Sequence, residues 1–326
     1  MRIAILGGGA WGSALAVSLC AAHDVRLWTR NARDCETLSR LRTSTYLPGI
    51  SLPAAIAIEG DLGAALSDRE IAIVATPTEG LRQTAKAVAA RRPGLSLLWA
   101  CKGFEEATRL LPHQVVAQVF STTPHAGALS GPSFALEVAQ GLPTALVLAS
   151  SDGTFAATTA SALNSSRLRL YSSTDVVGVE LGGAVKNVIA IAAGIADGLA
   201  LGRNARAALV TRGLAEIVRL GVALGGQAET FMGLAGLGDL VLTCTGSLSR
   251  NREVGLRLAR GERLPEILAA LGHVAEGVRS ARSVRDIARE HGAEMPIADA
   301  VCSVLFDGRD PADMVRQLLA REPRPE

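Results

Sequence analysis

"RIAILGGGAWGSALA", residues 2–16, is the stretch that decides the fold. Its first five residues are typical of a buried strand, and its alanine-rich end is typical of a helix. Gly7, Gly9 and Gly12 lie between them with GxGxxG spacing. In this pattern the glycines permit a tight turn, close approach of the backbone to a pyrophosphate, and close packing of helix on strand. We therefore predict a dinucleotide site at the N-terminus of this helix, where free N–H groups favour an anion.

The first half of the chain alternates short apolar runs with alanine-rich stretches, which indicates repeated βαβ units. Most of the runs are apolar on both faces, as in a parallel sheet covered by helices on each side. The predicted strands are residues 2–6, 24–28, 55–59, 70–76, 95–101, 126–130, 144–150 and 168–172. We predict a Rossmann-type doubly wound sheet for this dinucleotide-binding domain, residues 1–176.

From Thr174 onward the strand pattern stops. Predicted helices, separated by glycine-rich loops, cover residues 174–200, 204–224, 252–260, 264–270, 278–291 and 296–306. The fold class is therefore α/β, with an N-terminal Rossmann-type sheet followed by an all-helical C-terminal domain, residues 177–326. We expect this second domain to bind the substrate and carry out catalysis.

Composition excludes several classes of protein. A formal charge of +2 over 326 residues lacks the basic excess of a general nucleic-acid binder. The five cysteines are scattered without zinc or disulfide spacing, so we expect no metal and reduced thiols in a cytoplasm. The N-terminal residues have no signal-peptide pattern. An apolar run at residues 179–199 is long enough to cross a bilayer, but its glycines and charges favour a buried helix and no stable membrane insertion.

The end of the second predicted strand indicates which cofactor binds. An acidic residue there accepts from the ribose 2′-OH of NAD, whereas "LWTR" ends in Arg30, which suits the 2′-phosphate of NADP. The alternative is a solvated arginine at a strand end. We expect both NADP and NAD to bind, with NADPH preferred.

Ligands of open α/β sheets gather at the carboxyl ends of the strands. "LSLLWACKG" brings Lys102 to this edge, and "LSGPSFA" brings Gly131 and Ser133 to the start of a helix. These groups can hold a polar ligand, although Lys102 alone is equally consistent with a solvated loop.

"VELGGAVKNVIAIAAGIADGL", residues 179–199, places Lys186 and Asn187 inside an apolar helix. The ordinary explanation is that Lys186 extends its ammonium group to water along apolar surface. Asp239 is also unusual, because it lies between glycines and an apolar run where an unpaired carboxylate is costly. A pair between Lys186 and Asp239 would explain both.

A second cationic segment is "SRNR", in which Ser249, Arg250 and Asn251 introduce a helix with polar donors. Alone it is consistent with a surface turn or with an anion site. Lys102, Lys186 and Arg250 together suit a phosphorylated substrate better than an apolar one.

Several of these segments are shared with one known family. The chain resembles the bacterial NAD(P)-dependent sn-glycerol-3-phosphate dehydrogenases over nearly its whole length. The similar segments, in order from residue 7 to residue 280, are "GGGAWGSALA", "LWTR", "ACKGFE", "SGPSFA", "VELGGAVKNVIAIAAGIADGL", "RAALVTRGLAEI", "GLAGLGDLVLTCT", "SRNR" and "AEGVRS". The KN and GLGDL segments are far more specific than the glycine fingerprint.

The resemblance implies a cytoplasmic enzyme that interconverts dihydroxyacetone phosphate and sn-glycerol 3-phosphate and supplies phospholipid synthesis. It implies that Lys186 is the catalytic acid/base, with Asp239 as its partner. The substrate-site residues that it implies are Lys102, Gly131, Ser133, Lys186, Asn187, Asp239, Ser249, Arg250 and Asn251. The cofactor contacts, with Gly7, Gly9 and Gly12 added from the fingerprint, are Trp11, Arg30, Lys102, Ala135, Arg250, Val274 and Glu276.

Two other functions remain as alternatives. One is a two-domain reductase of 2-keto or 3-hydroxy acids, whose carboxylate substrate would not need Lys102 and Arg250 together. The other is a dinucleotide-sensing regulator, which would not need Lys186 and Asp239. The oligomeric state stays open, with a homodimer among the alternatives.

Overall fold

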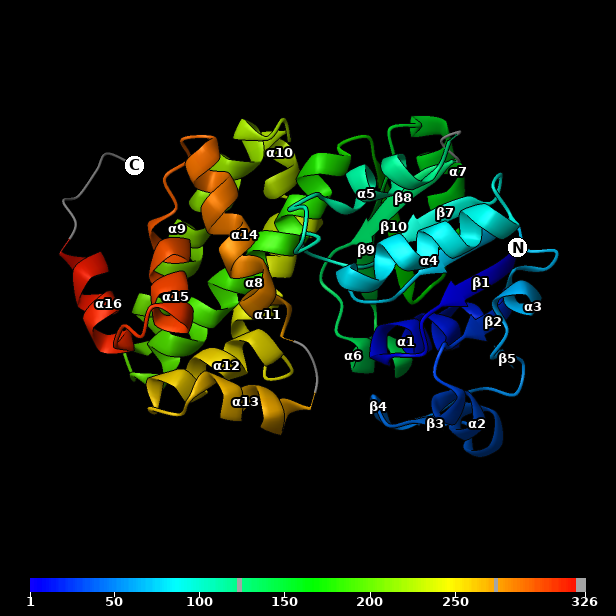
Figure 1. Cartoon of the computed structure of the whole chain (residues 1–326), viewed down its shortest axis with the longest axis horizontal. Coiled ribbons are helices and arrows are strands. Elements are labelled where there is room, and N and C mark those ends of the chain that lie inside the picture. Colours follow the sequence, from blue (N-terminus) through cyan, green and yellow to red (C-terminus); the bar gives the residue numbers. More distant parts are fainter. Residues whose placement is uncertain (122–124, 273–274, 321–326) are drawn as a thin grey trace. The chain divides into compact units, whose positions relative to one another are not determined.

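Strand β1 (Arg2–Leu6) lies inside an eight-stranded sheet with the order β10-β9-β8-β7-β6-β1-β2-β5 (Figure 1). The computed structural model describes residues 1–121, 125–272 and 275–320. The other strands of this sheet are β2 (Asp24–Trp28), β5 (Ala57–Glu59), β6 (Ile71–Val74), β7 (Ser96–Trp99), β8 (Ala126–Ser130), β9 (Thr144–Ala149) and β10 (Leu168–Ser173). Each of them falls within or beside a run that the sequence predicts as a strand.

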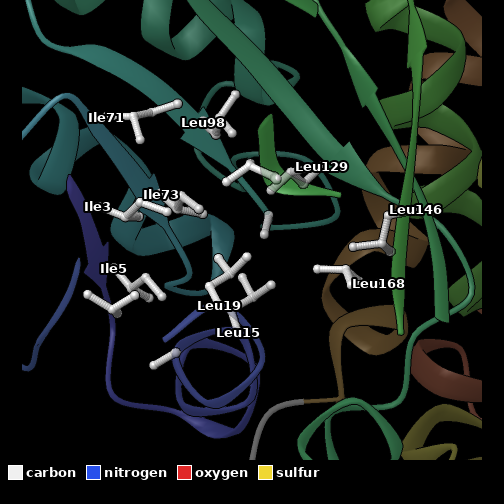
Figure 2. Packing of buried hydrophobic residues seen from close by; sticks show 14 of the residues in the cluster. Ile3, Ile5, Leu15, Leu19, Ile71, Ile73, Leu98, Leu129, Leu146 and Leu168 are labelled. Atoms are coloured by element: carbon white, nitrogen blue, oxygen red, sulfur yellow. The ribbon is translucent and has the colours of Figure 1, made fainter. Parts of the chain in front are cut away.

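The core of this unit forms because the strands are apolar on both faces. Ile3 and Ile5 point to one face, where they pack with Leu15 and Leu19 of α1 (Figure 2). The alternate residue Ala4 points to the opposite face and is also fully buried. The helices of this unit are α1 (Ala10–Leu19), α2 (Ala32–Leu41), α3 (Leu62–Leu66), α4 (Thr78–Arg91), α5 (Pro112–Val119), α6 (Ala135–Ala139) and α7 (Gly153–Leu163).

The sheet departs from the prediction in two places. Strands β8 and β9 pair antiparallel, whereas the sequence pattern is typical of a parallel sheet. The five-residue α6 between them does not carry the chain back along the sheet, so the chain reverses instead. A separate hairpin of β3 (Thr43–Ser44) and β4 (Leu47–Ser51) is also present, and the sequence does not predict it.

The chain folds as two compact units. The first consists of Met1–Glu105 and Leu110–Val176, and the second consists of Glu106–Arg109 and Val177–Glu326. The described residues of the second unit form helices and no strands. They are α8 (Val176–Gly198), α9 (Gly202–Ala223), α10 (Ala228–Phe231), η1 (Leu234–Gly238), α11 (Asp239–Thr245), α12 (Arg250–Ala259), α13 (Leu264–Leu271), α14 (Glu276–Glu290), α15 (Pro296–Phe306) and α16 (Pro311–Leu319).

Helix α8 is the central element of the second unit. Nearly all of its residues are buried, so its length and apolar character, which would suffice to cross a membrane, are those of a core helix. The prediction is wrong for residues 234–245, expected as a glycine-rich loop. They form η1, a π-helical turn, followed directly by α11. Glycines in such a sequence indicate a loop, but here they allow close helix packing.

Candidate functional site

The glycine-rich turn has the geometry that the fingerprint predicts. Gly7 has φ +132°, and an added Cβ would lie 2.8 Å from the carbonyl oxygen of Ala75. A Cβ on Gly12 would lie 1.8 Å from the carbonyl oxygen of Gly7, so only glycine allows α1 to begin this close to the turn. A Cβ on Gly9, the residue before α1, would meet nothing within 4 Å. The helix N-terminus therefore faces open space, which fits a diphosphate.

Two of the predicted cofactor residues lie beside this turn. Trp11 of α1 and Ala135 of α6 both pack against a small cluster that includes Ala14 and Val138. Arg30 follows β2 and is exposed, with its guanidinium donating to Oε1 of Gln83 over 3.0 Å. No carboxylate follows Trp28 directly, because the next two residues are Thr29 and Arg30. This end of β2 therefore offers a cation to the ribose side of a dinucleotide.

The predicted residues that follow β7 and β8 are brought together. Lys102 Nζ donates to the carbonyl oxygen of Gly131 over 3.1 Å, and Ser133 Oγ donates to the same oxygen over 3.1 Å. The hydroxyl oxygens of Thr76 and Ser130, near the ends of β6 and β8, are buried without a hydrogen-bond partner among the described residues. Buried hydroxyls are normally paired, so these two indicate that the edge is built to receive a polar ligand.

Lys186 and Asp239 form a buried ion pair, as the sequence predicts. Their side chains are 8% and 1% exposed. Lys186 Nζ also donates to Oγ1 of Thr243 over 3.0 Å, and this hydroxyl donates to the carbonyl oxygen of Asp239 over 2.6 Å. Two acceptors on α11 thus hold the ammonium group in one position, which is what a proton donor requires.

Close helix packing makes this pair possible. A Cβ on Gly182 would lie 2.4 Å from the carbonyl oxygen of Ala235, so α8 lies directly on the backbone of η1. Lys186 and Asp239 each lie four residues further along from Gly182 and Ala235. Residues four apart share a helix face, so this packing brings the two side chains together. A side chain at residue 182 would separate them.

The neighbouring Asn187 belongs to a chain of amides. Its Nδ2 donates to Oε2 of Glu276 over 3.4 Å, and its Oδ1 accepts from Nδ2 of Asn251 over 2.9 Å. Oδ1 of Asn251 accepts from the backbone N–H of Gly277 over 2.9 Å. Both amides therefore have a fixed orientation, and they connect α8, α12 and α14.

Helix α12 begins at Arg250, two residues earlier than predicted. Ser249 Oγ accepts from the backbone N–H of Arg252 over 3.3 Å and so caps the helix. Arg252 is held by Asp197 of α8 with Nη2 to Oδ2 at 2.6 Å. Arg250 is exposed beside these fixed residues. The N-terminus of α12, held by these contacts, therefore fixes the backbone position of Arg250.

The sequence missed Thr243 and Gly277, both of which contact predicted site residues. Thr243 lies four residues after Asp239, a spacing that would have identified it if α11 had been predicted. Cys244 is not a nucleophile here, because burial raises the pKa of its thiol to about 12. None of the five cysteines, all of which lie in the described ranges, forms a disulfide. Val274, expected at the cofactor site, lies outside the described residues.

Comparison with known proteins gives consistent results over both units. "NAD-dependent glycerol-3-phosphate dehydrogenase N-terminus" matches residues 2–156, and the C-terminus of the same family matches residues 175–316. The glycerol-3-phosphate dehydrogenase [NAD(P)+] of Thiobacillus denitrificans is 58% identical over all of both chains. That of Nitrosospira multiformis is 55% identical over 100% of this chain and 99% of its own. The crystal structure of glycerol-3-phosphate dehydrogenase from Coxiella burnetii has a TM-score of 0.93 and 40% identity, covering 98% of this chain and 99% of its own.

Proposed function

The chain belongs to the NAD-dependent glycerol-3-phosphate dehydrogenase family, and we propose that its two halves contribute different groups to one reaction. It interconverts dihydroxyacetone phosphate and sn-glycerol 3-phosphate with NAD(P). In this proposal residues 1–176 bind the dinucleotide, and residues 177–326 bind the substrate and supply the proton. When bound, the nicotinamide supplies the hydride.

The observation that carries the proposal is the buried pair of Lys186 and Asp239. Reduction of a ketone puts negative charge on its oxygen, and a fixed ammonium group can donate a proton to that oxygen. Asp239 and Thr243 orient Lys186 for this transfer, and in the reverse direction the same nitrogen receives the proton. We also assign the adjacent Asn187 of α8 to substrate binding. Hydrogen bonds with Asn251 and Glu276 fix the orientation of its side-chain amide.

The phosphate of the substrate is assigned to Arg250. A guanidinium group forms planar, paired hydrogen bonds with phosphate that an ammonium group cannot reproduce. Ser249 and Asn251 support it by fixing the start of α12. Lys102 and Ser133, which share the carbonyl of Gly131, are the polar groups that the first unit contributes to substrate binding.

Activity of the purified chain tests this assignment. Oxidation of NADPH should proceed with dihydroxyacetone phosphate and be far slower with dihydroxyacetone or with 2-keto acids. Arg250→Lys should raise KM for dihydroxyacetone phosphate and lower kcat, because remote binding of the phosphate positions the reacting carbonyl. Arg260→Lys, at the other end of α12, is the matched control. Equal turnover of dihydroxyacetone by the wild type would exclude a phosphate site.

Cofactor choice is assigned to Arg30. An exposed arginine–phosphate contact is worth about 1–3 kcal/mol, so NADPH should bind roughly five- to 150-fold better than NADH. Arg30→Ala should remove this preference and leave NADH kinetics almost unchanged, whereas Arg40→Ala on the following helix α2 should change neither. An equal loss with both cofactors would show that Arg30 is structural.

Three further features are proposed beside the activity. We propose that the enzyme works in the cytoplasm, supplies glycerol phosphate for phospholipid synthesis, and forms a homodimer. Support for the cytoplasm comes from the five free cysteines and from the burial of α8, the long apolar helix. Fractionation of cells, lipid labelling in a depletion strain and sedimentation of the purified chain test these features separately.

A further inference from the structure

Four residues of the loop after β7 belong to a different unit from their neighbours. Glu106–Arg109 group with the second unit, whereas the residues before and after them group with the first. The same loop contains Lys102, a predicted substrate-site residue. These four residues therefore pack as part of the second unit, although the chain on both sides of them belongs to the first.

The base of the loop is firmly anchored. Glu105 is buried, and Arg82 holds both of its carboxylate oxygens, with Nε and Nη2 each 2.7 Å from an oxygen. The backbone N–H of Glu105 donates to the carbonyl oxygen of Leu110 over 2.9 Å, which closes the loop. Gly103 has φ +123°, a conformation that favours glycine. The backbone conformation between Lys102 and Glu105 is therefore fixed.

The end of the four-residue segment is held by charge. Arg109 forms an ion pair with Glu290, the last residue of α14. Arg109 has φ +59°, a left-handed conformation that is uncommon for residues other than glycine. A non-glycine residue that keeps this conformation needs other contacts to hold it, and the ion pair is one of them. Helix α14 begins at Glu276, which accepts from Asn187 beside Lys186.

We propose that Arg109 and Glu290 are positioning residues for the reaction. Their ion pair fastens the segment Glu106–Arg109, which follows Lys102 in the chain, to α14, the helix whose Glu276 accepts from Asn187. The pair touches no reacting group, so it acts through Lys102. This inference rests on the proposed function, because it assumes that Lys102 binds the phosphorylated substrate.

The test is a charge-exchange cycle in the purified enzyme with dihydroxyacetone phosphate as substrate. Arg109→Ala and Glu290→Ala should each raise KM for dihydroxyacetone phosphate about two- to fivefold, the range for one exposed ion pair. The KM for NADPH should not change. The double variant should be no worse than either single variant, and the exchange Arg109→Glu with Glu290→Arg should recover most of the loss. High salt should reduce the difference from the wild type, because it screens exposed charges.

Two controls distinguish the ion pair from other causes. Arg289→Ala breaks another exposed ion pair of α14, with Asp299, and should leave KM unchanged. Arg109→Gly relieves the left-handed conformation without restoring charge, so it should match Arg109→Ala. Wild-type behaviour of Arg109→Gly, or failure of the exchange variant to recover, would overturn the proposal. Absence of wild-type activity with dihydroxyacetone phosphate would instead refute the proposed function.

Discussion

Two of the buried carboxylates in the described part of the second unit have different kinds of partner. Asp239 on α11 is paired with the ammonium group of Lys186. Glu216 on α9 accepts from the backbone N–H groups of Ile297 and Ala298, at 2.7 and 3.2 Å. Both are almost completely buried, at 1% and 3% exposure.

The difference shows that burial of a charged residue does not by itself indicate catalysis. Helix α15 has no side-chain cap of its own at Met295, and Glu216 supplies the missing acceptors from another helix. Its role is therefore structural. In the proposed function Asp239 instead orients a proton donor, so we expect the chemistry at its pair with Lys186.

The largest effect is expected at Lys186. Lys186→Met should lower kcat about 10²–10⁴-fold, the usual contribution of a positioned general acid. Glu216→Gln should leave kcat near the wild-type value. Steady-state turnover of dihydroxyacetone phosphate with NADPH measures both variants. Similar losses of kcat in the two variants would contradict the different roles assigned to Lys186 and Glu216.

A loss of stability is expected when Asp239 is removed alone. Asp239→Leu leaves the ammonium group of Lys186 buried without its counterion, which should cost about 3–5 kcal/mol of unfolding free energy. The double variant Lys186→Met with Asp239→Leu removes both charges and should recover most of this loss while remaining inactive. Urea unfolding followed by circular dichroism gives both values. A double variant as unstable as Asp239→Leu would show that the loss of unfolding free energy comes from altered packing and not from the unpaired charge of Lys186.

The smallest effect is the pH dependence of stability that Glu216 introduces. The pKa of its carboxyl is raised from 4.5 to about 7, mainly by burial and to a smaller extent by Asp299, although the two backbone N–H groups and Arg219 act in the opposite direction. Between these pH values the folded state binds more protons than the unfolded state, so stability falls as pH rises. The fall is at most about 3 kcal/mol.

Glu216→Gln removes this titration, so unfolding free energies measured at several pH values between 4.5 and 7 should fall less in the variant. The variant should also be less stable at every pH, because an amide nitrogen cannot accept from the second N–H group. An unchanged slope would assign the pH dependence to other groups.

Much of the first unit could be predicted because its signals are local. Apolar runs of strand length indicate the strands, and the steric requirements for glycine at residues 7 and 12 arise within a few residues of each other. The antiparallel pairing of β8 with β9 could not be predicted, because strand direction depends on the path of the chain between strands and not on the strands themselves.

In the second unit the residue pattern indicated a pair between Lys186 and Asp239, since each is a charge in an apolar setting, although a lysine that reaches water was the alternative. Other features depended on how the helices pack. Glu216 lies in "TRGLAEIVRL" among arginines, as a solvated helix residue would, until the start of α15 is placed on it. Asn187 finds Asn251 only because α8 and α12 pack together. Hydrogen bonds between residues far apart in the chain depend on how the helices pack, and a local sequence pattern does not predict that packing.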